Sequence, residues 1–349
     1  MRRESWIDSC RFLAIFVIMF THFLAMYHPS ALSLWEGGPS WWLLGGLTGK
    51  FSVAFFFVLL GFFASKPKPF GIAFYGSYCA RRYFQFAFYV FCVTFFYLIG
   101  SYAVTWLFHT PDEYVFHVLS DGPRYNLIYL LHDAFLFRDN YNTTLWCMPQ
   151  LFLASLVCRA LGCLPENWRP FHRLAAALAV MLLLMLLNGE FCIWICVAIL
   201  GYLLRLCLAH FQESAVFQKR WPLILVALAS VVCIKAPLPE GILLYALEGL
   251  GAFGLLLVQF HLEAVQKWLA KPPGPWLGGI SMGLFVVHTP INSLLCSSFY
   301  PLLSGRLPQS MVLTVLFFVS LGLCILCAWL LQCAYTDVSR RFIRVPTTV

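Results

Sequence analysis

The sequence predicts an all-α, polytopic membrane protein with about ten transmembrane helices. Of its 349 residues, 61% are hydrophobic and only 11% are charged, and the mean hydropathy is +0.80. Soluble domains carry about 25% charged residues, so most of this chain needs lipid as its solvent. The apolar stretches are continuous rather than alternating, which favours helical spans over a transmembrane β-barrel.

The apolar stretches are separated by short polar breaks, and no soluble domain is expected within residues 1–349. The predicted spans cover roughly residues 7–27, 48–64, 83–107, 145–163, 174–188, 191–210, 222–237, 242–262, 277–299 and 311–335. The second and fifth are short for a full crossing. Arg2 and Arg3 precede the first span, and no small-residue cleavage site follows it, so this segment is expected to stay as a signal-anchor.

Basic residues orient these spans. With the N-terminus inside, 18 of the 23 Lys and Arg residues fall on the cytoplasmic side, and the rest fall outside. Cytoplasmic loops of membrane proteins are enriched in Lys and Arg, so both termini are predicted to be cytoplasmic. The net charge of +8 follows from these flanking residues, and nucleic acid is not an expected partner.

The longest predicted loop covers residues 108–144 on the outer side. It is rich in acidic and aromatic residues, and its stretch 125–137 has the apolar spacing of an interfacial helix. Loops of this length inside compact domains are usually functional or disordered. The loop is therefore a candidate contact surface.

Cysteines and metals have no predicted chemical role. Nearly all of the 14 cysteines lie in apolar runs, where they are expected to pack between helices. No Cys/His spacing resembles a zinc site, and no permanently bound cofactor or metal is expected.

Ionisable residues inside a span usually mark function because burying them in lipid is costly. In the first span, Arg11 and His22 are eleven residues apart, close to three helical turns, so they share one face about 16 Å apart along the axis. Asp8 lies three residues before Arg11 and can orient its guanidinium. Either residue alone is more typical of an interfacial anchor or of helix packing. Together on one stripe, they favour a functional site.

The ninth span repeats this pattern. His288 lies at a depth similar to that of His22, and Ser281 lies two turns earlier on the same face. Pro290 is expected to loosen the helix just beyond the histidine. Two histidines at one depth predict a shared polar cavity. Glu248 in the eighth span either faces this cavity or lies just below the outer interface.

These residues resemble motifs of the membrane acyltransferase-3 family, bacterial enzymes that O-acylate sugars and related acceptors. The stretch from Ile7 to Arg11, followed by His22, is similar to the family's L-D-x-L-R-G segment and its histidine, with Phe12 in place of glycine. The other similar stretches are Ser52 to Phe62, Arg81-Arg82-Tyr83, Leu145-Trp146, and Ser281 to Pro290. Leu151 stands where the family often has glutamate.

The resemblance implies a multi-pass enzyme of the inner or plasma membrane, with acyl-CoA as donor and a glycan or lipid-linked sugar as acceptor. It implies that Arg11, Arg81 and Arg82 bind the donor phosphates at the inner mouth. His22 then acts as general base or transient acyl carrier. His288 and Ser281 complete a relay or bind the oxyanion, and Asp8 joins this catalytic group through Arg11. Acetyl is the expected acyl group.

Two other functions compete with this hypothesis. A proton-coupled transporter also uses buried histidines and an arginine, although no two-fold internal repeat is visible. A scaffolding protein would leave the burial of Arg11 and His22 unexplained. The outer loop, with stacking faces and hydroxyl partners, suits a sugar acceptor.

Overall fold

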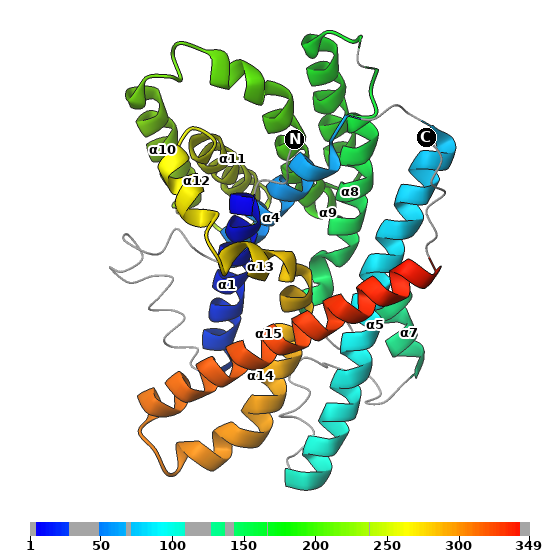
Figure 1. Cartoon of the computed structure of the whole chain (residues 1–349), viewed down its shortest axis with the longest axis vertical. Coiled ribbons are helices and arrows are strands. Elements are labelled where there is room, and N and C mark those ends of the chain that lie inside the picture. The colour runs from blue at the N-terminus through cyan, green and yellow to red at the C-terminus, as the bar shows by residue number, and fades with distance from the viewer. Residues whose placement is uncertain are drawn as a thin grey trace. The chain divides into compact units, whose positions relative to one another are not determined.

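A computed structural model describes residues 5–27, 49–67, 71–108, 127–136, 143–165, 167–236 and 238–342 (Figure 1). Within these ranges every regular element is a helix, as the composition predicted. Most of the predicted outer loop, residues 109–126 and 137–142, lies outside the described residues. The orientation of the termini stays a prediction.

The helices follow the predicted apolar runs. In chain order they are α1 (Ser5–Tyr27), α4 (Gly49–Ala64), α5 (Ile72–Phe108), α7 (Leu127–Leu136), the 3-10 helix η1 (Thr143–Cys147), α8 (Met148–Gly162), α9 (Pro170–Glu213), α10 (Arg220–Ile234), α11 (Ile242–Gln259), α12 (Glu263–Leu269), α13 (Gly274–Gly279), α14 (Ser281–Ser304) and α15 (Gln309–Phe342). Helix α7 lies inside the stretch 125–137, where a helix was predicted.

Seven helical stretches in the described ranges are long and apolar enough to cross a membrane, judged by length and composition. They are α1, α5, Leu145–Gly162, α9, α11, α14 and α15. Helices α4 and α10 are apolar but shorter. The chain is therefore a helical membrane protein, while the count of ten crossings stays a prediction.

Helix α9 reverses direction at Asn188, where the backbone leaves helical geometry (φ −163°, ψ 93°). The Cys196 thiol donates to the carbonyl oxygen of Met181 at 3.7 Å, although fifteen residues of straight helix would separate them by about 22 Å. The Asn188 side-chain oxygen accepts the backbone N–H of Phe191 at 3.1 Å, which is the bond of an N-cap. The two arms match the separate spans predicted over 174–188 and 191–210.

The chain divides into two compact units. Unit 1 contains Met1–Ile18, Trp35–Cys79 and Gln150–Gly278, and unit 2 contains Met19–Leu34, Ala80–Pro149 and Gly279–Val349. Helices α4, α9, α10 and α11 pack against one another in unit 1, and α14 packs against α15 in unit 2. Residues 5–18 of α1 belong to unit 1 and residues 19–27 to unit 2.

Small residues bring helices of unit 1 into backbone contact. A Cβ atom on Gly61 of α4 would lie 1.7 Å from the carbonyl oxygen of Ala198, and one on Gly201 of α9 would lie 1.9 Å from that of Val58. Helices in lipid lack a hydrophobic driving force for association, so close approach through small residues supplies the packing instead. This contact fixes α4 against the second arm of α9.

Two arginines of unit 1 hold the end of α4. Arg159 donates to the carbonyl oxygens of Ala64 and Lys66 at 3.3 and 2.8 Å, and Arg205 donates to that of Phe62 at 3.2 Å. The last carbonyls of a helix have no partner inside it and carry partial negative charge. Both guanidinium groups therefore stabilise the C-terminus of α4.

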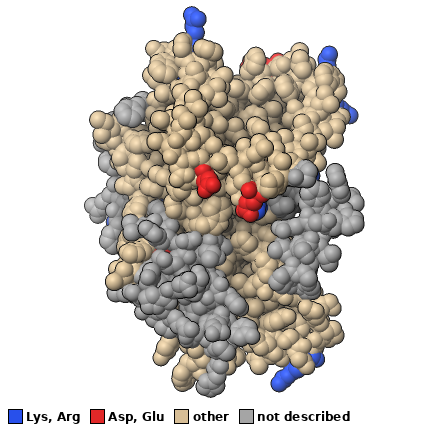
Figure 2. All heavy atoms as spheres, turned by 180° about the vertical axis from the view of Figure 1, so that it is seen from behind, with Lys and Arg blue, Asp and Glu red and all other residues tan. Residues whose placement is uncertain are grey.

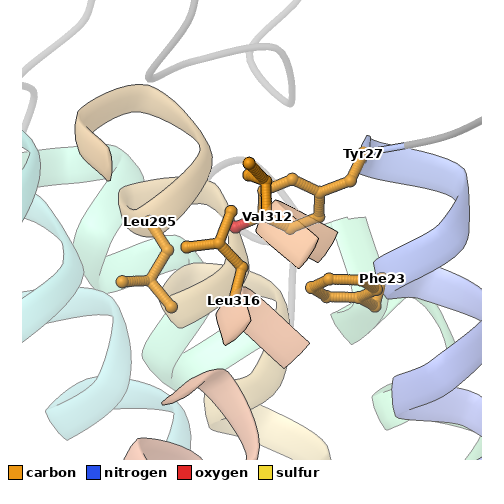
Figure 3. Packing of buried hydrophobic residues seen from close by; sticks show 5 residues of the cluster. All are labelled: Phe23, Tyr27, Leu295, Val312 and Leu316. Carbon is orange, nitrogen blue, oxygen red and sulfur yellow. The ribbon is translucent and has the colours of Figure 1, made fainter. Parts of the chain in front are cut away.

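In unit 2, an apolar cluster joins α1, α14 and α15. It consists of Phe23, Tyr27, Leu295, Val312 and Leu316, which point toward one another in Figure 3. Phe317 extends the cluster, and its ring makes a T-shaped contact with the ring of Phe23 at 5.3 Å between centroids. This packing sets the end of α1 against α14 and so fixes the rotation of both helices.

The surface is apolar, as expected for a chain that contacts lipid. Figure 2 shows a face on which Lys, Arg, Asp and Glu are sparse among the described residues. Large side chains such as Phe96, Leu186 and Val232 are more than half exposed. Exposed apolar surface of this kind marks a membrane-facing protein.

Replacing Gly61 by Ala is expected to destabilise unit 1 by about 1–3 kcal/mol or more, because the added methyl group overlaps a backbone oxygen that has no room to move. The measurement is thermal unfolding of the detergent-purified protein. Gly76→Ala is the matched control, since a Cβ at Gly76 meets no atom within 4 Å. Equal melting temperatures for the two variants would contradict the close packing of α4 on α9.

Candidate active site

The two predicted histidines meet inside unit 2. His22 near the end of α1 and His288 of α14 form a hydrogen bond of 2.8 Å between Nδ1 of His22 and Nε2 of His288. The ring planes are within 16° of parallel and the centroids are 5.1 Å apart, as expected of two imidazoles joined by one N–H···N bond. His288 is fully buried, and His22 is partly buried.

The backbone of α14 fixes the protonation of His288. Nδ1 of His288 lies 2.8 Å from the carbonyl oxygen of Phe285 and 3.2 Å from that of Leu284. Carbonyl oxygens only accept hydrogen bonds, so Nδ1 must carry the proton and donate it. In the neutral imidazole, Nε2 of His288 is then unprotonated and accepts.

This assignment also fixes the state of His22. Its Nδ1 faces an acceptor on His288, so Nδ1 of His22 carries the proton, and Nε2 keeps its lone pair. The position of these hydrogens is assigned from the hydrogen-bond network. Nε2 of His22 is therefore the ring nitrogen that can act as a base or nucleophile. His288 accepts a hydrogen bond from the other ring nitrogen, Nδ1.

A second polar group lies one helical turn beyond the histidines. The Tyr27 hydroxyl donates to the backbone carbonyl of Asn292 at 2.9 Å, and the Ser320 hydroxyl donates to the side-chain oxygen of Asn292. These bonds tie α1 and α15 to the segment of α14 that carries His288. Sequence reasoning missed all three residues. The available signal was an asparagine four residues after His288, which places both on the same face of one helix.

Ser281 does not reach the histidine pair. It is the first residue of α14 and lies about 10 Å before His288 along the helix axis. Its hydroxyl is buried and has no hydrogen-bond partner among the described residues. Pro290 lies inside α14, and the loosening of the helix beyond His288 stays a prediction. The predicted part of Ser281 in a relay or in binding the oxyanion stays a prediction.

Asp8 and Arg11 form the predicted pair in unit 1. The guanidinium donates to the Asp8 carboxylate at 3.3 Å, and about 30% of the Arg11 side chain is exposed. The end of α12 and helix α13 cover this turn of α1, because Ser9 donates to the carbonyl oxygen of Leu269 and a Cβ on Gly278 would lie 1.8 Å from the Asp8 carbonyl oxygen. Arg11 is thus held while its charge stays accessible.

Arg11 and His22 lie on one continuous helix, so the predicted separation of about 16 Å along the axis holds for the helix itself. A passage that joins them stays a prediction. On α5 in unit 2, Arg82 donates to the side-chain oxygen of Gln85 at 2.8 Å and lies over the ring of Phe86. Arg81 is half-buried beside it. Their binding of phosphate stays a prediction.

Glu248 lies on α11 in unit 1. It is buried in α11, and one of its carboxylate oxygens has no partner among the described residues. Near it, Glu240 accepts from the Tyr245 hydroxyl at 2.6 Å and pairs with Lys50 at 2.9 Å. The Tyr245 hydrogen bond and the Lys50 ammonium hold the pKa of Glu240 below its usual value. A cavity shared by Glu248 and the histidines stays a prediction.

The 14 cysteines all lie in described segments and are unpaired. Across the described residues, no group of three or more His, Cys, Asp or Glu side chains is placed to hold a metal ion.

The comparison with protein families identifies the chain. The acyltransferase domain of the acyltransferase-3 family matches residues 4–329. The chain belongs to this family. Neither curated proteins nor solved structures give a match. The resemblance inferred from the first-span and ninth-span motifs is therefore confirmed, and this acyltransferase-3 protein is a membrane acyltransferase.

Proposed function

We propose that this protein transfers an acyl group, most simply acetyl, from cytoplasmic acyl-CoA to a hydroxyl of an envelope or exported glycan. The hydrogen bond between His22 and His288 carries this proposal. Acyl transfer to a hydroxyl needs a group that removes the hydroxyl proton, and a neutral histidine with a free ring nitrogen is the commonest such group. The family match supports the acyltransferase class.

In the proposed reaction, Nε2 of His22 first accepts a proton and later gives it up. This nitrogen takes the proton of the acceptor hydroxyl as its oxygen attacks the thioester carbonyl, and a tetrahedral intermediate forms. The C–S bond then breaks, the acyl group stays on the acceptor oxygen as an ester, and the proton passes from His22 to the departing CoA sulfur. Transient acylation of the same nitrogen is the alternative route.

His288 acts as a positioning residue in this scheme. When His22 gains a proton, its Nδ1–H bond to His288 becomes charge-assisted and therefore stronger. The α14 carbonyls of Leu284 and Phe285 keep Nε2 of His288 unprotonated and ready to accept. His288 thus has the role of the aspartate in a Ser-His-Asp hydrolase triad, which orients the histidine base and stabilises its charged form.

The donor is proposed to bind through its phosphates. Arg11 is a partly exposed cation with a fixed guanidinium, and acyl-CoA is a polyanion whose phosphates suit the arginine fork. Arg81 and Arg82 are proposed to contribute further cations. The pantetheine arm would then run along α1 toward His22.

Transport loses support as the alternative function, because the family is one of acyltransferases.

His22→Ala is expected to lower acyl transfer by about 10²–10⁴-fold because it removes the base. His288→Ala is expected to lower it as well, because His22 then loses the hydrogen bond that orients it. The measurement is CoA thiol release from acetyl-CoA by protein reconstituted in lipid nanodiscs with a candidate glycan. His172→Ala is the control, since His172 is exposed. Full activity of the His22 variant would refute its catalytic role.

Arg11→Lys is expected to raise the KM for acetyl-CoA while leaving kcat nearly unchanged, because the charge remains but the two-pronged contact with phosphate is lost. S-acetylpantetheine, which lacks the nucleotide phosphates, provides the internal comparison, and its KM should not change. Arg306→Lys on an exposed turn is the control. An equal KM increase for both donors would show that Arg11 does not bind phosphate.

A further inference from the structure

An apolar pocket lies between α5, α14 and α15 in unit 2. Its volume is about 390 Å³, which falls within the roughly 300–1,000 Å³ of ligand sites in proteins. Among the described residues that line it, none is charged. Tyr97 belongs to the wall, and its hydroxyl already shares a hydrogen bond of 3.0 Å with that of Ser293. The pocket therefore offers an occupant mainly apolar contacts.

Three close contacts between helices frame the pocket. Helix α14 meets α5 at Gly100, where a Cβ atom would lie 2.9 Å from a side chain of α14, and it meets α15 at Gly283, where a Cβ atom would lie 2.9 Å from the backbone of α15. Helices α5 and α15 are joined by the Tyr89 hydroxyl, which donates to the side-chain oxygen of Gln332 at 2.5 Å. The packing of the three helices therefore holds the pocket open.

The pocket has a buried floor and an exposed rim. Its floor includes Val93, Val287 and Pro290, which are buried. At its rim, the Phe96 and Leu330 side chains are 63% and 51% exposed. The pocket therefore opens at the apolar outer surface of unit 2.

The depth of the pocket in the membrane follows from the predicted spans. Val93 and Phe96 lie close to the centre of the span predicted over 83–107, and Val287 and Pro290 lie close to the centre of the span predicted over 277–299. The hydrocarbon core of a bilayer is about 30 Å thick. At its centre, the pocket is surrounded by the acyl chains of lipids.

An apolar space of this size is unfavourable when it is empty. Atoms that line a void lose their dispersion contacts on one side, and water does not replace them, because apolar cavities stay dry. A hydrocarbon chain restores these contacts without any polar group. Three helices surround it, so the chain touches more protein atoms than a chain on a flat helix face does.

We infer that this pocket is a binding site for one hydrocarbon chain of a membrane lipid. A lipid headgroup is excluded from it, because a polar group would lose its hydration without hydrogen-bond partners in the wall. Val287 and Pro290 of the floor flank His288 in the sequence, so the bound chain packs against the turn of α14 that carries this histidine. Neither acyl-CoA nor an acceptor takes part in this binding.

The test uses the full chain in nanodiscs made with phosphatidylcholine that carries a diazirine in the middle of one acyl chain. After light activation, mass spectrometry of peptides should find lipid adducts concentrated on pocket residues, including the buried Val93 and Val287. Ala334→Phe at the rim places a ring in the pocket and should remove most of these adducts. Gly322→Phe on the same helix is the matched control, since a Cβ atom there meets no atom within 4 Å, and its adducts should match those of the wild type.

Two results would overturn the site. Adducts spread over exposed apolar residues such as Phe95 and Leu182, in proportion to their exposure, would show that lipid only surrounds the protein. Adducts on those residues but none in the pocket would show that a second copy or another part of the chain fills it. Thermal unfolding verifies that Ala334→Phe is folded, and Leu330→Trp is a second variant that fills the pocket from its rim.

Discussion

The candidate active site depends on hydrogen bonds from one imidazole to its own helix. His288 donates through Nδ1 to the carbonyls of Phe285 and Leu284, and this bond determines which nitrogen of each histidine carries a proton. Without it, either nitrogen of His22 could be the free one. No carboxylate among the described residues contacts the histidine pair, so the backbone carbonyls are what fixes the tautomer. Backbone oxygens take the place of an aspartate.

The packing around α14 serves this arrangement. Tyr27 and Ser320 bind Asn292 from two other helices, and the apolar cluster of Phe23, Leu295 and Leu316 fills the space beside them. Since helices in lipid are held by close packing and a few polar bonds, each such contact limits the rotation of α1 against α14. That rotation decides whether the two imidazole rings meet.

Much of the fold follows from the sequence, because uninterrupted apolar length and polar breaks are local signals. These signals predicted the two arms of α9, on either side of Asn188, as separate apolar stretches. They also predicted a helix where α7 lies. The similar depth of His22 and His288 could also be predicted from local sequence, since it follows from counting residues along a helix. The hydrogen bond between the two histidines could not be predicted in this way, because it depends on how α1 and α14 are rotated against each other. For the same reason, Tyr27, Asn292 and Ser320 were missed.

The most direct test of this account is the tautomer of His22, measured by ¹⁵N NMR of histidine-labelled protein in lipid, with His22→Ala to assign the signals. We expect a neutral ring with its proton on Nδ1 and a free Nε2. We also expect that His288→Ala removes the hydrogen-bond shift of that Nδ1–H. A His22 ring protonated on Nε2, or a spectrum insensitive to His288, would contradict it.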